Sequence, residues 1–219
     1  MKKIIKKIYK NTFEKLFPST RDIFDGLLIS ELKHCHSLLD IGCGPSSPFG
    51  RIKNELNLDL YSIGVDNFDP YIEISKRNRI HSEYIKSDIL SINYPDKNFD
   101  CAILIDVIEH FNKEDFLNFL PKLEKMVKKI IIMTPNGFVK QDEYDGNFLQ
   151  VHKSGWTVKE MEHLGFKCFG ISGIKFLRRE KALTIIRPIV LGNIISDITE
   201  QFVYNRPELA YHLMCIKNI

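Results

Sequence analysis

Apolar and polar positions follow two different periods along most of this chain. Short apolar runs with the length of buried strands alternate with stretches in which apolar residues recur at helical spacing. The runs predict strands at about 37–41, 60–66, 83–87, 99–105, 129–134, 166–171 and 209–216. The stretches between them predict helices just after Pro48, from Pro70 to Arg79, at 113–127 and from Thr157 to His163.

This alternation predicts an α/β fold with a parallel sheet covered by helices on both faces, because right-handed crossovers place helices on each side. The nearly unbroken apolar runs at 101–105 and 130–133 are typical of central strands buried on both faces. Four strands end at Gly42, Asp66, Asp88 or Asp106. Because ligands of such sheets bind at the carboxyl ends of the strands, we expect the site there.

Two segments lie outside the alternation. Residues 3–17 place apolar side chains at helical spacing among lysines, which predicts a basic amphipathic helix packed on the domain. Contact of this helix with a membrane surface is an alternative that we do not favour. Residues 174–206 carry a helical apolar face, which fits packing on the core, a substrate lid, a dimer surface or a membrane contact.

The length of 219 residues and the hydrophobic content of 44% suit one domain with a full core. We expect a single domain over residues 1–219. Its predicted parts are N-terminal helices at 1–36, a cofactor-binding core at 37–173, a helical insertion at 174–206 and a last strand at 207–219. A capping box of Ser19 and Asp22 predicts that one of the N-terminal helices continues to Leu32.

Charge and cysteine content exclude several classes of protein. The net charge of +3 is too small to predict a nucleic-acid partner. The five cysteines include no C-x-x-C pair, so neither a disulfide framework nor a cysteine zinc site is predicted. No apolar run reaches the roughly 18 residues that span a bilayer, and no signal-peptide segment is recognised. We therefore expect a cytoplasmic protein; the sequence carries no signal of oligomeric state.

The strongest local motif is the glycine pair that follows the first strand. An apolar strand followed directly by Gly42-x-Gly44 predicts a sharp turn that presents backbone N–H groups to a nucleotide-like ligand. Asp66 ends the next strand, near the spacing at which an acid meets ribose hydroxyls. Ser47 stands where the dinucleotide fingerprint needs a glycine, and Pro45 removes one N–H donor from the loop.

These motifs together resemble the class I S-adenosylmethionine-dependent methyltransferases, particularly the type 11 group. The resemblance covers roughly residues 37–173 and rests on LLDIGCG, GVD, KSDIL, FDCAILIDVIEHF and TPNG in this order, followed by HKSGW and LGF. It implies a three-layer Rossmann-like fold whose mostly parallel sheet has seven strands, the last of them antiparallel. It also implies S-adenosylmethionine as the cofactor and methyl transfer as the reaction.

The resemblance further implies which residues bind the cofactor, in two groups. Those near its methionine end would be Asp40, Gly42, Cys43, Gly44, Ile105 and Asp106. Those near its adenosine end would be Asp66 with the adjacent Asn67 at the ribose, Asp88 at the adenine amino group, and Ile89 on the adenine ring. A sulfonium cation beside several carboxylates is electrostatically favourable, whereas the pyrophosphate of a dinucleotide would be repelled.

Methyl transfer from a sulfonium chiefly requires alignment of the acceptor, and it requires a general base only where the acceptor arrives protonated. His110 and His152 are the candidate bases. Glu109, His152 and Trp156 are candidates for binding the acceptor, through hydrogen bonds and an aromatic wall. The polar loop at 136–154 favours a hydroxylated or amino acceptor, which we expect to be a small polar or glycan-like molecule.

Three alternatives remain. Asp106, Glu109, His110 and His152 could surround a divalent ion, in an arrangement similar to the Glu-x-x-Glu-His pattern of methyltransferases that act on RNA ends. Asp106 replaces the first glutamate of that pattern and no basic, aromatic-rich surface stands out, so we predict no metal and keep metal-assisted RNA methylation as an alternative. An NAD-dependent oxidoreductase and a non-catalytic cofactor-binding protein are the other two.

Overall fold

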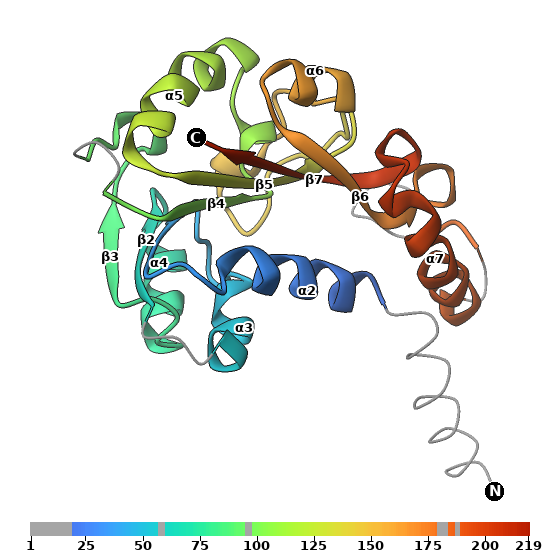
Figure 1. Cartoon of the computed structure of the whole chain (residues 1–219), viewed down its shortest axis with the longest axis horizontal. Coiled ribbons are helices and arrows are strands. Elements are labelled where there is room, and N and C mark those ends of the chain that lie inside the picture. The colour runs from blue at the N-terminus through green and yellow to red at the C-terminus, as the bar shows by residue number, and fades with distance from the viewer. Residues whose placement is uncertain (1–18, 57–59, 95–97, 179–183, 187–188) are drawn as a thin grey trace, which may run out of the picture.

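A seven-stranded mixed sheet runs through the centre of the protein. The computed structural model describes residues 19–56, 60–94, 98–178, 184–186 and 189–219, and the predicted basic helix at 3–17 lies outside these ranges. The sheet has the order β3-β2-β1-β4-β5-β7-β6 (Figure 1). Its strands are β1 (Ser37–Ile41), β2 (Tyr61–Asp66), β3 (Glu83–Lys86), β4 (Cys101–Ile105), β5 (Lys129–Pro135), β6 (Lys167–Ile174) and β7 (Ala210–Asn218).

The strand directions confirm the predicted sheet. β3, β2, β1, β4 and β5 pair in parallel with their neighbours. β7 pairs antiparallel with β5 on one side and with β6 on the other, so the last strand lies inside the sheet. The strand order reverses between β1 and β4, and in sheets of this kind the crevice at such a reversal is where ligands bind.

Helices cover both faces of the sheet, as predicted. Figure 1 shows α2 (Thr20–Leu32), α3 (Phe49–Leu56) and α4 (Asp69–Arg77) below the sheet, and α5 (Lys113–Met126) and α6 (Val158–His163) above it. α7 (Ile189–Tyr204) lies beside β6. Capping boxes begin α2 at Ser19 and α6 at Thr157, as their sequences predict.

The central strands are buried on both faces. Leu39 and Ile132 belong to the core that α5 and α6 cover, whereas their neighbours Leu38 and Ile131 belong to the core that α2 and α3 cover. This period of two confirms that the unbroken apolar runs are doubly buried strands. Within the described ranges, no helix combines the length and the apolar character needed to cross a bilayer.

Some predicted boundaries differ from the structure. β4 begins at Cys101 because Phe99 makes only an isolated bridge, and β6 continues to Ile174. On α7, Val203 is buried but Ile198 and Phe202 are 41% and 46% exposed. The predicted apolar face of the 174–206 segment therefore packs on the core only in part; the division of the chain into functional parts stays a prediction.

Candidate active site

The glycine turn after β1 is fixed to the end of β2. The backbone N–H of Gly42 donates to the carbonyl of Val65 at 2.7 Å, and that of Gly44 donates to Asp66 Oδ2 at 2.9 Å. Gly42 has a φ of 70°, and an added Cβ would lie 2.6 Å from Val107 Cγ2. Only glycine combines this left-handed backbone with so close an approach.

Asp40 holds the other side of the same turn. Its buried carboxylate accepts a hydrogen bond from the Ser47 hydroxyl and lies 3.3 Å from His81 Nε2. The Ser47 oxygen in turn accepts the backbone N–H of Phe49 at 3.2 Å, where α3 begins. Ser47, which in the sequence only argued against a dinucleotide site, therefore links the turn to α3.

Asp66 and Asp88 lie at the ends of β2 and β3. The two carboxylate oxygens of Asp66 accept backbone N–H groups from Gly44 and Phe68, each at 2.9 Å. Burial raises the pKa of Asp66, and these hydrogen bonds oppose the rise. Asp88 accepts the N–H of Leu90 at 3.0 Å. Because each carboxylate oxygen has two acceptor sites, both acids retain capacity for a ligand.

Two cavities meet at the carboxyl ends of β1 and β4. The smaller, of about 100 Å³, is lined by Asp66, Asn67, Asp88, Ile89, His110 and Lys153 among others. The larger, of about 720 Å³, has Asp40, Cys43 and Ile105 in its wall, together with polar groups such as Arg21, Tyr71 and Tyr144. Four residues line both cavities, namely Gly42, Gly44, Asp106 and Gln150. The shared wall lies at the reversal of strand order.

Asp106 occupies this junction in a strained backbone conformation. Its φ is 54°, which is uncommon for a residue other than glycine and which active sites often retain. Its backbone N–H donates to the carbonyl of Met133 at 2.9 Å, which fixes it beside β5. Its side chain is exposed to the cavities, but partial desolvation by the surrounding protein raises the pKa of its carboxyl to about 7. A cation bound nearby would favour the ionised form.

Glu109, His110 and His152 come together next to Asp106. Glu109 and His110 belong to the short 3-10 turn η2 (Ile108–His110), and one possible ligand atom from each of the three side chains lies within 4.8 Å of the others. Burial, followed by the nearby charge of Asp106, raises the pKa of Glu109. Burial lowers the pKa of His110 to about 4 and also lowers the pKa of His152, so both rings are neutral at pH 7.

Trp156 corrects one expectation. Its side chain is 1% exposed, packs edge-on against Phe116 with ring centroids 5.3 Å apart, and donates its indole N–H to the carbonyl of Ile108 at 3.4 Å. Like Glu109 and His152, the other two candidates for binding the acceptor, it lines neither of the two cavities. The expected aromatic wall is therefore not at the site, because the large apolar ring is buried in the core beneath α5.

Ser172 and His212 are site residues that sequence reasoning missed. They face each other across β6 and β7, with His212 Nδ1 2.7 Å from Ser172 Oγ, and both line the larger cavity. Burial lowers the pKa of His212 to about 3. The two residues are far apart in sequence and lie in apolar strands. Only the placement of β7 beside β6 brings them together, so no local motif could have identified them.

Comparison with known proteins agrees with the predicted family and fold. Residues 39–131, from β1 into β5, match the family model described as a methyltransferase domain. This region therefore carries a methyltransferase domain, in agreement with the predicted resemblance to the class I S-adenosylmethionine-dependent methyltransferases. A crystal structure of a SAM-dependent methyltransferase from Archaeoglobus fulgidus has a TM-score of 0.56 and 23% identity to this protein, covering 96% of this chain and 100% of that one. The plantazolicin methyltransferase BpumL in complex with SAH has a TM-score of 0.53 and 20% identity, covering 100% and 90%.

Curated relatives share the same region. The chain is 30% identical over 161 residues to an uncharacterized protein of Methanocaldococcus jannaschii, over 73% of its length. It is 25% identical to a sterol 24-C-methyltransferase of Yarrowia lipolytica over 59% of the chain, and 28% identical to a probable tRNA methyltransferase 9B of Mus musculus over 52%. The chain spans 66%, 39% and 24% of the lengths of these relatives. The predicted family and fold are confirmed.

The residues present fit the cofactor of this family, S-adenosylmethionine. An added Cβ on Gly44 would meet no atom within 4 Å, so the backbone there borders open space at the junction of the cavities. Among the described residues that line the smaller cavity, Lys153 is the only lysine or arginine, against three aspartates. Carboxylates favour an amino group, a sulfonium and ribose hydroxyls and would repel a pyrophosphate.

Proposed function

We propose that this protein transfers a methyl group from S-adenosylmethionine to a polar, hydroxyl-bearing acceptor. The observation that carries the proposal is the junction of the two cavities at Gly42, Gly44 and Asp106. The smaller cavity has the acids that suit an adenosine group, and the larger has room and polar groups for an acceptor. When bound, the cofactor supplies an electrophilic methyl group on a sulfonium, and the junction is where that group would face the acceptor.

On the cofactor side, residues of the chain bind and orient S-adenosylmethionine. In this proposal Asp66 accepts hydrogen bonds from the ribose hydroxyls while Gly44 and Phe68 hold its carboxylate in place. Asp88 accepts from the adenine amino group and Ile89 packs on the ring. Asp106 places a negative charge beside the positive end of the cofactor, which lowers the free energy of the bound cation.

On the acceptor side, the chain aligns a nucleophile and excludes water. Alignment of two reactants in near-attack geometry is worth roughly 7–11 kcal/mol of activation free energy. When no metal ion is bound to them, the neutral rings of His110 and His152 offer a base for the proton of an acceptor hydroxyl, which contributes about 100-fold to 10,000-fold. Of these two histidines, His110 lines the smaller cavity and His152 lines neither cavity. The polar wall that includes Tyr144, Ser172 and His212 suits a small polar or glycan-like acceptor.

Calorimetric titration with S-adenosylhomocysteine and with NAD tests the cofactor. We expect the wild-type protein to bind S-adenosylhomocysteine and not NAD. Asp66→Asn should weaken binding about tenfold or more, because hydrogen bonds to a charged group contribute about 1.5–3 kcal/mol. Asp69→Asn is the matched control, since Asp69 is exposed and pairs with Lys86 on the surface. Binding of NAD alone would overturn the proposal in favour of the oxidoreductase alternative.

Transfer of an isotope-labelled methyl group, followed by mass spectrometry, tests the acceptor. The panel contains hydroxylated small molecules, oligosaccharides and tRNA. Transfer to a small polar or glycan-like acceptor is the expected result. Transfer to tRNA alone would favour the RNA alternative, for which the similarity to a probable tRNA methyltransferase gives support. Binding of S-adenosylhomocysteine without turnover on any acceptor would favour a non-catalytic cofactor-binding protein.

A further inference from the structure

We infer that Glu109, His110 and His152 form a binding site for one divalent first-row transition-metal ion beside the junction of the two cavities. This reverses the expectation of a metal-free site drawn from the sequence. The inference rests on the geometry of the three side chains. The role of this ion in methyl transfer, which is to coordinate the acceptor oxygen, rests in addition on the proposed function.

The possible ligand atoms of the three side chains lie close together, around one small volume. One carboxylate oxygen of Glu109 and one ring nitrogen of each histidine lie within 4.8 Å of one another. Nitrogen and oxygen ligands bind such ions at about 2.0–2.2 Å, so ligands of a shared ion lie at most about 4.4 Å apart. Ligands that are not opposite each other lie closer, roughly 3.0–3.5 Å apart, so the side chains would need to draw together by up to about 1–2 Å.

The hydrogen bonds of the two histidines select the tautomer that a metal needs. His110 Nδ1 lies 3.3 Å from the carbonyl of Val151, and His152 Nδ1 lies 2.6 Å from the carbonyl of Val139. A carbonyl oxygen can only accept, so these contacts favour the tautomer in which Nδ1 carries the hydrogen and Nε2 keeps its lone pair; the backbone of Asp106 is a second hydrogen-bond partner of the His110 ring. An imidazole held by its other nitrogen in this way is typical of metal ligands.

Glu109 provides an independent indication of a missing partner. Its side chain is 1% exposed, and Oε2 accepts from the hydroxyl of Thr134 at 3.0 Å, but Oε1 is buried without a hydrogen-bond partner in the described part of the chain. A buried polar atom left unsatisfied costs about 1–3 kcal/mol. A bound cation would satisfy this oxygen.

The backbone holds the three ligands in this arrangement. The carbonyl of Glu109 accepts the N–H groups of Lys153 at 2.8 Å and Ser154 at 3.0 Å, and the N–H of His152 donates to the carbonyl of Gln141 at 3.1 Å. These bonds fasten the loop that carries His152 onto η2. The site is therefore pre-organised and does not depend on exposed, freely rotating side chains.

The ligand set indicates the class of ion. Two imidazoles with one carboxylate suit ions from Mn²⁺ to Zn²⁺ better than Mg²⁺ or Ca²⁺, which prefer oxygen ligands. Three protein ligands leave coordination positions open. Of the three ligands, His110 lines the smaller cavity beside Asp106, so an acceptor oxygen that reaches across the junction from the larger cavity could occupy an open position. The ion would then lower the pKa of an acceptor hydroxyl and orient it.

Titration of the tag-free full chain with Mn²⁺, after treatment with a chelator, tests the site. Mn²⁺ is the probe because the five cysteines of the chain would bind softer ions such as Zn²⁺. Electron paramagnetic resonance of the free ion should give one Mn²⁺ per chain for the wild type. His110→Asn, His152→Asn and Glu109→Gln should each weaken binding at least tenfold. His163→Asn, which changes an exposed histidine of α6, should bind as the wild type does.

Absence of saturable Mn²⁺ binding to the wild type, or equal binding by His152→Asn, would overturn the inference. Circular dichroism checks the fold of each variant. If Glu109→Gln fails to fold because its carboxylate is buried, the two histidine variants still decide the outcome. Calorimetry with S-adenosylhomocysteine on the same samples separates the two proposals. Mn²⁺ binding without S-adenosylhomocysteine binding would support the metal site and contradict the cofactor, and the reverse result would do the opposite.

Discussion

Gly42 and Asp106 have left-handed backbone conformations at the ends of the adjacent strands β1 and β4. Glycine adopts this conformation at no steric cost, whereas aspartate tolerates it with some strain. Both residues line both cavities. Part of the backbone strain among the described residues thus lies where cofactor and acceptor would meet.

Gly42→Ala should reduce the free energy of unfolding by about 1–3 kcal/mol, because the new Cβ would combine unfavourable φ with a contact of 2.6 Å to Val107 Cγ2. Urea denaturation measures this change. Gly26→Ala is the control: Gly26 lies within α2 with no atom within 4 Å of an added Cβ, and alanine there should stabilise by roughly 0.5–1 kcal/mol. Equal effects of the two substitutions would contradict the argument.

His212 should make stability depend on pH. Its pKa is lowered from 6.5 to about 3 by burial, so between these values the unfolded chain binds a proton that the folded chain does not. The stability that the neutral ring contributes is therefore complete above pH 6.5 and is lost as pH falls towards 3. His212→Asn should flatten the curve of unfolding free energy against pH by roughly 1 kcal/mol per pH unit between about pH 6 and 4. Urea denaturation at each pH measures both curves. Parallel curves for the wild type and His212→Asn would contradict this role of His212.

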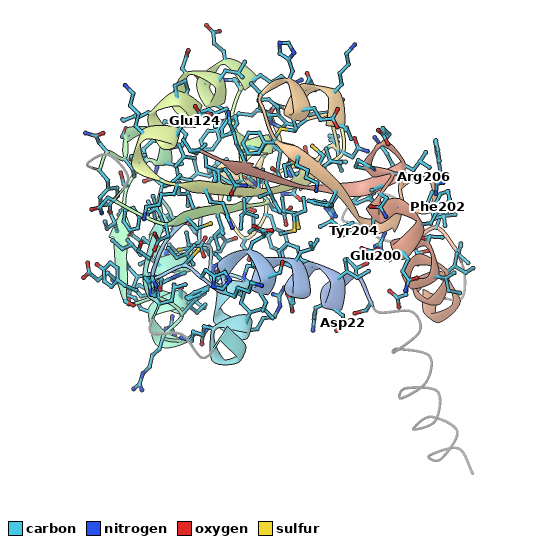
Figure 2. The ribbon with its side chains drawn as sticks, viewed as in Figure 1. Asp22, Glu124, Glu200, Phe202, Tyr204 and Arg206 are labelled. Carbon is cyan, nitrogen blue, oxygen red and sulfur yellow. The ribbon has the colours of Figure 1, made fainter. Side chains whose placement is uncertain are left out.

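At the scale of elements, a buried carboxylate on α7 helps to hold this helix against the sheet. Figure 2 shows the side chain of Glu200 on α7. Its carboxylate accepts the backbone N–H groups of Ser172 at 2.8 Å and Gly173 at 2.5 Å, and the hydroxyl of Thr20 at 3.0 Å. Ser172 and Gly173 lie in an irregularity of β6 that leaves their N–H groups free of the regular ladder. Glu200 therefore joins three elements that are distant in sequence.

Glu200→Gln should lower the free energy of unfolding by about 1–3 kcal/mol, because the amide cannot accept through both of its polar atoms and leaves a buried N–H unsatisfied. Chemical denaturation compares it with Glu208→Gln, a change of an exposed glutamate in the turn after α7. A change in stability as small as that of the control would show that Glu200 is dispensable.

Helices and strands could be predicted where a local pattern of residues defines them. They were harder to predict where pairing with a distant strand or helix sets their ends. The doubly buried β4 and β5 and the capping box at Thr157 could be read directly from residue order. The end of β6 could not, because it depends on the irregularity that Glu200 satisfies. At the site, the acids at strand ends follow from topology, whereas the Ser172–His212 pair requires the position of β7. Trp156 was misplaced because a loop residue can turn into the core.

For the whole molecule, binding of the cofactor or its product should raise the free energy of unfolding. A ligand that binds only the folded state at 100 times its Kd adds about 2.7 kcal/mol, which corresponds to a rise in Tm of roughly 5–10 °C for a chain of this size. S-adenosylhomocysteine should produce this rise in a thermal-shift assay, and NAD should not. An unchanged Tm with S-adenosylhomocysteine at millimolar concentration would contradict the proposed cofactor.

The interior position of β7 constrains the order in which the sheet can assemble on the ribosome. β5 and β6 do not pair with each other; both pair with β7, which is translated after them. Until Ala210–Asn218 emerges, β5 presents an open edge and β6 has no partner in the sheet. Exposed edges favour pairing with other chains. During synthesis the parallel half of the sheet, which carries the predicted cofactor residues, can therefore form early, whereas the wall containing Ser172 and His212 must wait for the last strand.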